Sequence, residues 1–226
     1  FEGHGYERPK PLILVNGVPM FITSLASIEG IEYSELVIVA LKQHEELFGI
    51  SQYLIEYQVK RAKLVLIEEV TQGQLCTVLA AADFINKNED ILIIGSDTIV
   101  QSNIGEDIQK KGDNCKGLIS VANMPGDRWS FASVDENGRV IEVAEKVRIS
   151  SHASTGMYYF SNGKDFVDFS NEMIANKETT KGEYYVIPVY QKMIANCDFI
   201  GISNANAMWD LGTPDSLREY LNEEAQ

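Results

Sequence analysis

The chain has 226 residues, enough for one large α/β domain or two small ones. Its 19 basic and 33 acidic residues give a formal net charge of −14, and a surface this acidic repels the phosphates of DNA and RNA, which argues against a nucleic acid partner. Its apolar runs are the length of strands, and none approaches the ~20 residues that span a bilayer, so we expect no membrane segment.

Three cysteines, Cys76, Cys115 and Cys197, lie far apart in the sequence and form no Cys-x-x-Cys pair. Their odd number and spacing predict reduced thiols in a cytoplasmic protein. The amino end shows no charged and then apolar leader, which agrees with that location.

The first informative segment places Lys10 between Pro9 and Pro11, just before an apolar strand. Proline fixes its own φ and biases the preceding residue toward an extended backbone, so Lys10 is held on a stiff segment. A long cation on a rigid mount is suited to binding phosphate. Taken alone, however, the segment favours an ordinary surface lysine in a proline-rich loop.

Strand and helix signals alternate over the first half of the chain. We predict strands at 12–15, 35–41, 63–67 and 91–94, helices at 19–28 and 74–84, and a polar amphipathic stretch at 42–57. Short buried strands that alternate with helices predict a parallel, doubly wound sheet with its ligands at the carboxyl edge.

The second half begins with consecutive strands. We predict strands at 117–122, 129–134, 140–145 and 156–160, a hairpin turn at Asn137-Gly138, helices at 164–175, 185–195 and 213–221, and a strand at 199–203. No linker or repeat interrupts the chain. We therefore expect a single α/β domain over residues 1–226, with a mixed, mainly parallel, Rossmann-like central sheet and a smaller inserted β-rich part.

Two aspartates stand where an α/β fold places its ligands. Asp97 follows a buried strand and Gly95, and a carboxylate at that position suits Mg²⁺, although a cap on the following turn explains it about as well. Asp210 precedes Gly212 and a helix that Thr213 can cap with Pro214 in its first position. An elaborate helix start is the competing interpretation of Asp210.

Glu145 and Lys146 end a predicted strand. Adjacent residues on a strand point to opposite faces, so a solvated pair of charges is the default. Both side chains reach one cleft only if the backbone kinks there.

These features form an ordered string: Pro9-Lys10-Pro11-Leu12, Thr71-Gln72-Gly73, Gly95-Ser96-Asp97, Glu145-Lys146, Thr155–Phe160 and Asp210-x-Gly-Thr-Pro. The string resembles the nucleoside-diphosphate-sugar pyrophosphorylase (sugar-1-phosphate nucleotidyltransferase) family over essentially the whole chain. Segments 128–132, 143–146 and 182–190 are similar to a branch found among capsular and surface-polysaccharide genes. The resemblance implies the nucleotide-diphospho-sugar transferase-like fold, with residues 1–115 as the nucleotide-binding half and 116–226 as the acceptor-binding half.

On the nucleotide side, the resemblance implies that Lys10 binds triphosphate and stabilises charge at the transferring phosphorus. Thr71 and Gly73 would contact the nucleobase. Asp97 and Asp210 would together hold Mg²⁺, with Asp97 also close to the nucleotide. Carboxylates shared with substrate phosphates fit the oxygen preference of that ion.

On the acceptor side, the resemblance implies that Glu145 binds sugar hydroxyls and Lys146 binds the acceptor phosphate. Gly156 would let the sugar approach the backbone. Trp129 is a candidate for lining the pocket, although an aromatic residue on a strand is more often core. Ser130 stands where many relatives carry a glycine against the sugar, so a different acceptor shape is expected.

The amino end departs from the family pattern. Relatives open with a strand and a Gly-rich loop whose N–H groups cradle the triphosphate. Phe1 resembles the apolar residue that follows this loop, so we expect a strand and loop of about 15 to 20 residues to be missing before it.

The resemblance thus implies a Mg²⁺-dependent enzyme that joins an NTP, with a pyrimidine favoured, to a phosphorylated acceptor and releases pyrophosphate. A sugar 1-phosphate in surface-polysaccharide precursor synthesis is the preferred acceptor, and phosphocholine or a phospho-amino acid is an alternative. A related glycosyltransferase and a non-catalytic nucleotide-sugar-binding homologue also remain open, although the lone Asp97 lacks the Asp-x-Asp pattern of the former. A homo-oligomer is left open.

Overall fold

The computed structural model describes residues 1 and 3–224. Its strands are β1 (Leu14–Val15), β2 (Val18–Pro19), β3 (Leu36–Leu41), β4 (Ala62–Ile67), β5 (Ile91–Ile93), β6 (Thr98–Ser102), β7 (Cys115–Ala122), β8 (Ser130–Val134), β9 (Val140–Glu145), β10 (Ala153–Phe160) and β11 (Phe199–Asp210).

Its helices are α1 (Met20–Ser24), α2 (Lys42–Phe48), α3 (Ile50–Glu56), α4 (Gln74–Leu79), α5 (Ala82–Ile85), α6 (Ile104–Lys110), α7 (Gly163–Ala175), α8 (Ile187–Ala195) and α9 (Pro214–Glu224), with 3-10 turns at Lys10–Leu12 and Leu25–Ile28. No helix in the described part of the chain is long and apolar enough to cross a bilayer.

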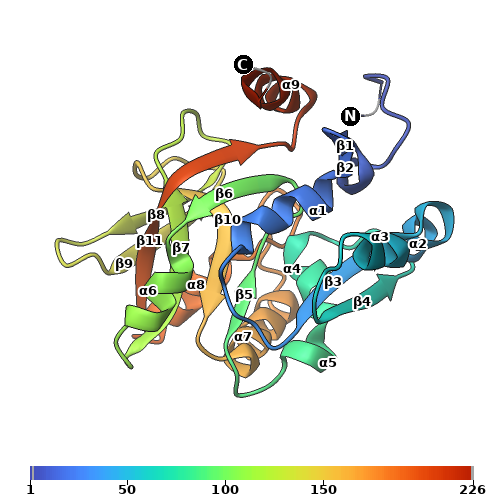
Figure 1. Ribbon diagram of the computed structural model, residues 1–226. Helices are drawn as coiled ribbons and strands as arrows, with labels where there is room; N and C mark the ends of the chain where they lie inside the picture. Colours follow the sequence, from blue (N-terminus) through green and yellow to red (C-terminus); the bar gives the residue numbers. More distant parts are fainter. Residues whose placement is uncertain (2, 225–226) are drawn as a thin grey trace.

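The strands form a seven-stranded sheet and two two-stranded sheets (Figure 1). The large sheet has the order β6-β11-β7-β10-β8-β9, and β5 pairs with β10 beside this path. The pairs β3–β4 and β7–β11 are parallel, and the other described pairs are antiparallel. The mixed α/β fold class is confirmed, and antiparallel pairing is more extensive in it than the alternation of strands and helices indicates.

Apolar side chains on both faces of the large sheet make the core. Successive residues of a strand point to opposite faces, so Ile119 and Tyr158 join the cluster that includes residues of α7 and α8. Their neighbours Leu118 and Tyr159 join a second cluster, which includes Ile104 of α6. The sheet is therefore buried between layers, and its strand ends are left to position polar groups.

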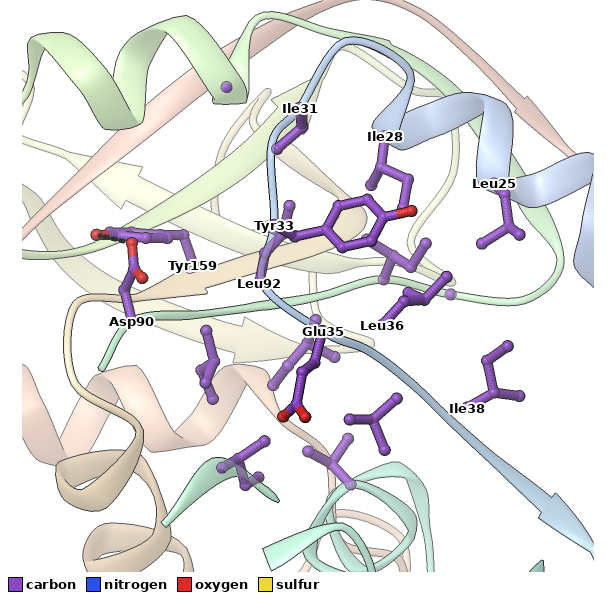
Figure 2. A pocket seen from close by; sticks show the side chains of 18 of the residues that line it. Leu25, Ile28, Ile31, Tyr33, Glu35, Leu36, Ile38, Asp90, Leu92 and Tyr159 are labelled. Atoms are coloured by element: carbon purple, nitrogen blue, oxygen red, sulfur yellow. Dashed lines mark hydrogen bonds between the residues drawn. The ribbon is translucent and has the colours of Figure 1, made fainter. Parts of the chain in front are cut away.

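A groove of about 990 Å³ separates β3 from β5. Figure 2 shows side chains that line it, among them Leu36, Leu92 and Tyr159. Among the described residues, β3 pairs only with β4 and β5 pairs only with β10, so the two strand edges that face the groove carry no strand partner. At one end the groove reaches Asp97.

Candidate active site

The pairing of β6 with β11 brings two distant aspartates together. The strands are antiparallel and match Thr98 with Asp210, so Asp97 lies directly before the paired segment. The Leu211 N–H donates to the Asp97 carbonyl at 2.8 Å. A Cβ on Gly212 would lie 2.8 Å from Asp210 Oδ1 and 3.0 Å from Asp97 Oδ2. The two carboxylates therefore converge on the backbone of Gly212. Asp210 Oδ1 and Asp97 Oδ2 lie no farther apart than the sum of these two distances.

Each of these carboxylates is paired with one cation. Lys10, in the 3-10 turn after Pro9, places Nζ 2.6 Å from Asp97 Oδ2. Arg128 places Nη2 2.7 Å from Asp210 Oδ2, and the Asp210 side chain is only 12% exposed. The position of Lys10 agrees with the role expected for it, whereas Arg128 was given no role in the sequence interpretation.

The carboxylate pair meets the basic requirements of a Mg²⁺ site. A Cβ on Gly212 would collide with both carboxylates, so the glycine lets them approach this closely. Residues 1 and 3–224 contain no cluster of three or more His, Cys, Asp or Glu side chains that could hold a metal. Mg²⁺ is usually bound through one or two carboxylates plus substrate phosphates and water, so Asp97 and Asp210 fit that mode.

A second polar cluster forms where β9 ends. Lys146 has φ +56°, so the backbone kinks at the point where the default arrangement would send Glu145 and Lys146 to opposite faces. The Ser130 hydroxyl donates to Glu145 Oε2, and Lys146 Nζ donates to the Tyr185 hydroxyl. The same Nζ lies 4.6 Å from the centre of the Tyr185 ring.

The environment shifts the pKa of both charged groups in this cluster. Burial raises the pKa of Glu145, and the Ser130 hydrogen bond and Lys146 oppose that change. The hydrogen bond to Tyr185 raises the pKa of Lys146, and nearby Glu145 and Glu183 act in the same direction, whereas burial opposes it. Lys146 is therefore held as a cation, the form that binds phosphate.

Tyr185 and Glu183 extend this cluster beyond the residues expected from the sequence. The Tyr185 hydroxyl donates to Glu183 Oε2. Both residues lie in the segment that carries the branch resemblance, 182–190, but neither was named as a candidate site residue. The sequence feature that could have identified these two residues is the run Gly182-Glu183-Tyr184-Tyr185, in which an aromatic residue follows polar residues just before a helix.

Trp129 lies in a loop that it helps to hold, and Gly156 lies at an irregularity in β10. The Trp129 indole N–H donates to the Pro125 carbonyl at 2.9 Å, and its ring stacks with Arg128 at 4.2 Å. Gly156 has φ +84° and lies where the register of β10 shifts between Ser154 and Tyr158. No atom lies within 4 Å of a Cβ placed on Gly156, so the space beside it is open.

Thr71 and Gly73 form a loop that precedes α4. The Thr71 hydroxyl donates to the Gly73 carbonyl at 2.9 Å, and Gly73 has φ +128°. The Tyr184 N–H donates to the Gln72 carbonyl at 2.9 Å, and the Leu75 N–H donates to the Tyr184 carbonyl at 3.1 Å. These bonds tie the expected nucleobase loop to the residue that precedes Tyr185, not directly to the carboxylate pair.

Comparisons with known proteins identify the family of the chain. A family model described as nucleotidyl transferase matches residues 5–226. The bifunctional protein GlmU of Thermotoga sp. (strain RQ2) is 31% identical over 130 residues, which cover 54% of this chain and only 28% of that protein.

Solved structures show the same fold at low identity. The nucleoside-diphosphate-sugar pyrophosphorylase from Vibrio cholerae RC9 superposes with a TM-score of 0.83 at 24% identity, over 96% of this chain and 93% of that one. HddC from Yersinia pseudotuberculosis gives a TM-score of 0.69 at 15% identity, over 97% of this chain and 91% of that one.

Proposed function

Because the chain belongs to the nucleotidyl transferase family, we propose that it joins an NTP to a sugar 1-phosphate and releases pyrophosphate. The observation that carries the proposal is the convergence of Asp97, Asp210 and Lys10 around Gly212, at the end of a sheet. The structural neighbour named as a nucleoside-diphosphate-sugar pyrophosphorylase supports a sugar phosphate as the acceptor. A pyrimidine nucleotide is the favoured donor.

The reaction needs no nucleophile from the protein. An oxygen of the acceptor phosphate attacks the α-phosphorus and forms the new P–O bond, while the bond from that phosphorus to the bridging oxygen breaks and pyrophosphate leaves. The work of the protein is to align the two phosphates and offset their charge. Lys10 binds the triphosphate, and Lys146 binds the acceptor phosphate.

Asp97 and Asp210 are the residues that would hold Mg²⁺. When bound, the ion would supply charge neutralisation for the phosphates. The glycine at position 212 supports this assignment, because a Cβ there would lie 2.8 Å from Asp210 Oδ1 and 3.0 Å from Asp97 Oδ2 and would force the carboxylates apart.

The second cluster provides the acceptor side of the proposal. Glu145 is 8% exposed and accepts hydrogen bonds, so it is suited to sugar hydroxyls. Ser130 orients it, and the open space beside Gly156 gives a sugar ring access to the backbone. Thr71 and Gly73 would contact the base, and Trp129 acts in this proposal by supporting Arg128 rather than by touching the acceptor.

The groove between β3 and β5 supports the expectation of a further strand in the nucleotide-binding half. Two unpaired strand edges and an apolar lining are what an inserted strand requires, because it would satisfy backbone groups on both sides. The groove ends at Gly95 and Asp97. A loop that follows such a strand would reach the place where the triphosphate is proposed to bind.

The test is pyrophosphate release from the protein with each of the four common NTPs and a panel of acceptors that contains sugar 1-phosphates, phosphocholine and phospho-amino acids. Release that depends on one NTP and one sugar 1-phosphate supports the proposal. Release only with phosphocholine or a phospho-amino acid changes the acceptor class, and no release with any pair rejects the activity.

Two conservative variants test the carboxylate pair. Asp97→Asn and Asp210→Asn keep the size of each side chain and remove its charge, so we expect each to abolish release at any Mg²⁺ concentration while the circular dichroism spectrum stays unchanged. Asp215→Asn, which alters an exposed carboxylate of α9, is the control. Full activity in both site variants would refute the metal assignment.

The wider role is part of the same proposal. Surface-polysaccharide precursor synthesis is supported by the resemblance of segments 128–132, 143–146 and 182–190 to that branch. Because NTPs are the substrates, we place the reaction in the cytoplasm.

A further inference from the structure

Arg128 covers the carboxylate that the proposed function assigns to metal. Its Nη2 lies 2.7 Å from Asp210 Oδ2, and its side chain is 50% exposed whereas that of Asp210 is 12% exposed. The guanidinium therefore lies on the solvent side of a nearly buried carboxylate. Any cation that binds Asp210 Oδ2 from solvent competes with Arg128.

The loop that carries Arg128 is held on both sides. The guanidinium stacks on Trp129 at 4.2 Å, and the Trp129 indole donates to the Pro125 carbonyl. Arg148 donates to the Gly126 carbonyl at 2.8 Å and to the Met124 carbonyl. Because these contacts do not involve Asp210, they can keep the loop in place after the Arg128–Asp210 ion pair opens.

Arg128 also stands between the two clusters. Ser130, two residues further on, donates to Glu145, and the Lys146 N–H donates to the Trp129 carbonyl at 2.9 Å. The same short segment thus touches the carboxylate pair at Arg128 and the proposed acceptor cluster at Ser130. A phosphate bound between the carboxylate pair and the acceptor cluster would therefore lie close to the Arg128 guanidinium.

We propose that Arg128 is a phosphate-binding residue that rests on Asp210 in the absence of metal and turns to a substrate phosphate when a divalent cation takes the carboxylate. The proposal rests on the proposed function. Lys10 and Arg128 pair one to one with Asp97 and Asp210, so a divalent cation on both carboxylates releases two positive charges beside the phosphates. The planar fork of guanidinium donors matches phosphate oxygens.

A purely structural ion pair would behave differently. An ion pair that only holds the structure together contributes to stability and is indifferent to ligands. A resting contact instead weakens metal binding and strengthens phosphate binding. Measuring the binding of a metal ion and of pyrophosphate to the same variants therefore distinguishes a structural ion pair from a resting contact.

The first measurement is a titration with Mn²⁺ alone, followed by electron paramagnetic resonance. Arg128→Gln removes the competitor of the metal, so we expect it to bind Mn²⁺ about two- to fivefold more tightly than the unmodified protein, the ratio that an exposed pair implies. Arg218→Gln, which breaks an exposed Arg–Asp pair in α9, is the matched control and should leave binding unchanged. Unchanged, weaker or undetectable binding in Arg128→Gln overturns the resting contact.

The second measurement is calorimetric binding of Mg²⁺-pyrophosphate. Arg128→Gln should weaken it about tenfold or more, because charge-assisted hydrogen bonds are lost, and Arg128→Lys should recover part of that loss. Equal affinity in all three proteins overturns the phosphate role. Neither titration requires transfer chemistry, so these outcomes are distinct from a failure of the proposed reaction itself.

Discussion

Gly212 is the residue on which the candidate site is centred. A Cβ at this position would lie 2.8 Å from Asp210 Oδ1, 3.0 Å from Asp97 Oδ2 and 3.1 Å from Lys10 Nζ. The Gly212 N–H also donates to Asp210 Oδ1 at 2.8 Å. The Gly212 N–H therefore orients the Asp210 carboxylate, and the lack of a side chain on Gly212 leaves room for the Asp97 carboxylate.

Gly212→Ala is expected to push these charged groups apart without unfolding the chain. A displacement of about 1 Å can lower a rate roughly a hundredfold, so we expect a loss of that order in pyrophosphate release. The free energy of unfolding of Gly212→Ala in urea is the control that separates a local displacement from a loss of folding. Activity within twofold of the unmodified protein would show that the spacing at Gly212 is not limiting.

Glu145 gives the site a pH dependence that stability measurements can follow. Burial raises its pKa in the folded chain above the ordinary value of 4.5. Between the ordinary and the raised value, the folded state holds the proton more tightly, so its contribution to stability falls as the pH rises through that window.

Glu145→Gln removes this titration. We therefore expect the free energy of unfolding of the variant, relative to the unmodified protein, to increase as the pH rises above 4.5 and then to level off. Urea unfolding of both proteins between about pH 4 and pH 7 measures the difference. A difference that stays constant across this range would contradict the assigned direction.

At the residue scale, the sequence identified groups that lie at the ends of strands. Asp97 and Lys10 stand out because a strand or a proline pair fixes where they point. Arg128 and Tyr185 do not stand out, because their partners are 82 and 39 residues away and no spacing rule connects a loop arginine to a distant aspartate. Glu183 is only 2 residues from its partner, Tyr185, and stands out only once Tyr185 has been placed. Their positions come from tertiary packing.

Among the helices, α8 is hydrogen-bonded to the large sheet through Tyr190. This fully buried residue donates to the carbonyls of Leu118 and Tyr159 at 3.1 and 2.8 Å, and its ring stacks on Phe160 at 4.4 Å. Gly117 makes room for it, because a Cβ there would lie 2.6 Å from the Tyr190 ring. The hydroxyl bridges β7 and β10 from outside the sheet.

Tyr190→Phe keeps the ring and removes both hydrogen bonds. Buried carbonyls that lose a partner cost about 1–3 kcal/mol, so the free energy of unfolding in urea should fall by that amount. Tyr33→Phe, whose hydroxyl reaches the Lys60 carbonyl only at 3.5 Å in an exposed position, is the control and should change stability by less than about 0.5 kcal/mol. Equal stability of Tyr190→Phe and the unmodified protein would refute this account.

Most predicted elements match the structure, although β6 and the helix α6 that follows it were not predicted and β11 is longer than predicted. The strand predicted at 199–203 runs on to Asp210, because the polar Asn204 and Asn206 flank a register shift rather than an end. The segment Thr98–Ser102 was not predicted as a strand. It has few apolar residues of its own and is held by Ser27, whose Oγ accepts from the Val100 N–H at 3.0 Å.

At the scale of the whole molecule, the groove leaves β3–β4 outside the hydrogen-bonded network of the large sheet. The Leu36 N–H donates to Arg61 beside β4, so by alternation the N–H groups of Val37 and Val39 face the groove. A further strand in the groove can therefore be detected by hydrogen exchange at individual amides.

Hydrogen exchange of residues 1–226 should show Val37 and Val39 exchanging faster than Ile38 and Ala40, which face β4. In a longer form of the protein that supplies a strand to the groove, Val37 and Val39 should be protected by about tenfold or more, since exchange then requires local opening. Equal exchange in the two proteins would contradict an inserted strand. Amides of β7 should serve as the internal reference in both.

The strand order also bears on how the chain is made. β11, from the last part of the sequence, lies between β6 and β7, which are both translated much earlier. A nascent polypeptide on the ribosome therefore carries two unjoined sheet edges until β11 emerges, and Asp210 arrives with that strand. Translation products that stop before β11 would consequently lack both a joined sheet and half of the carboxylate pair, which makes synthesis of this strand a condition for any catalytic capacity.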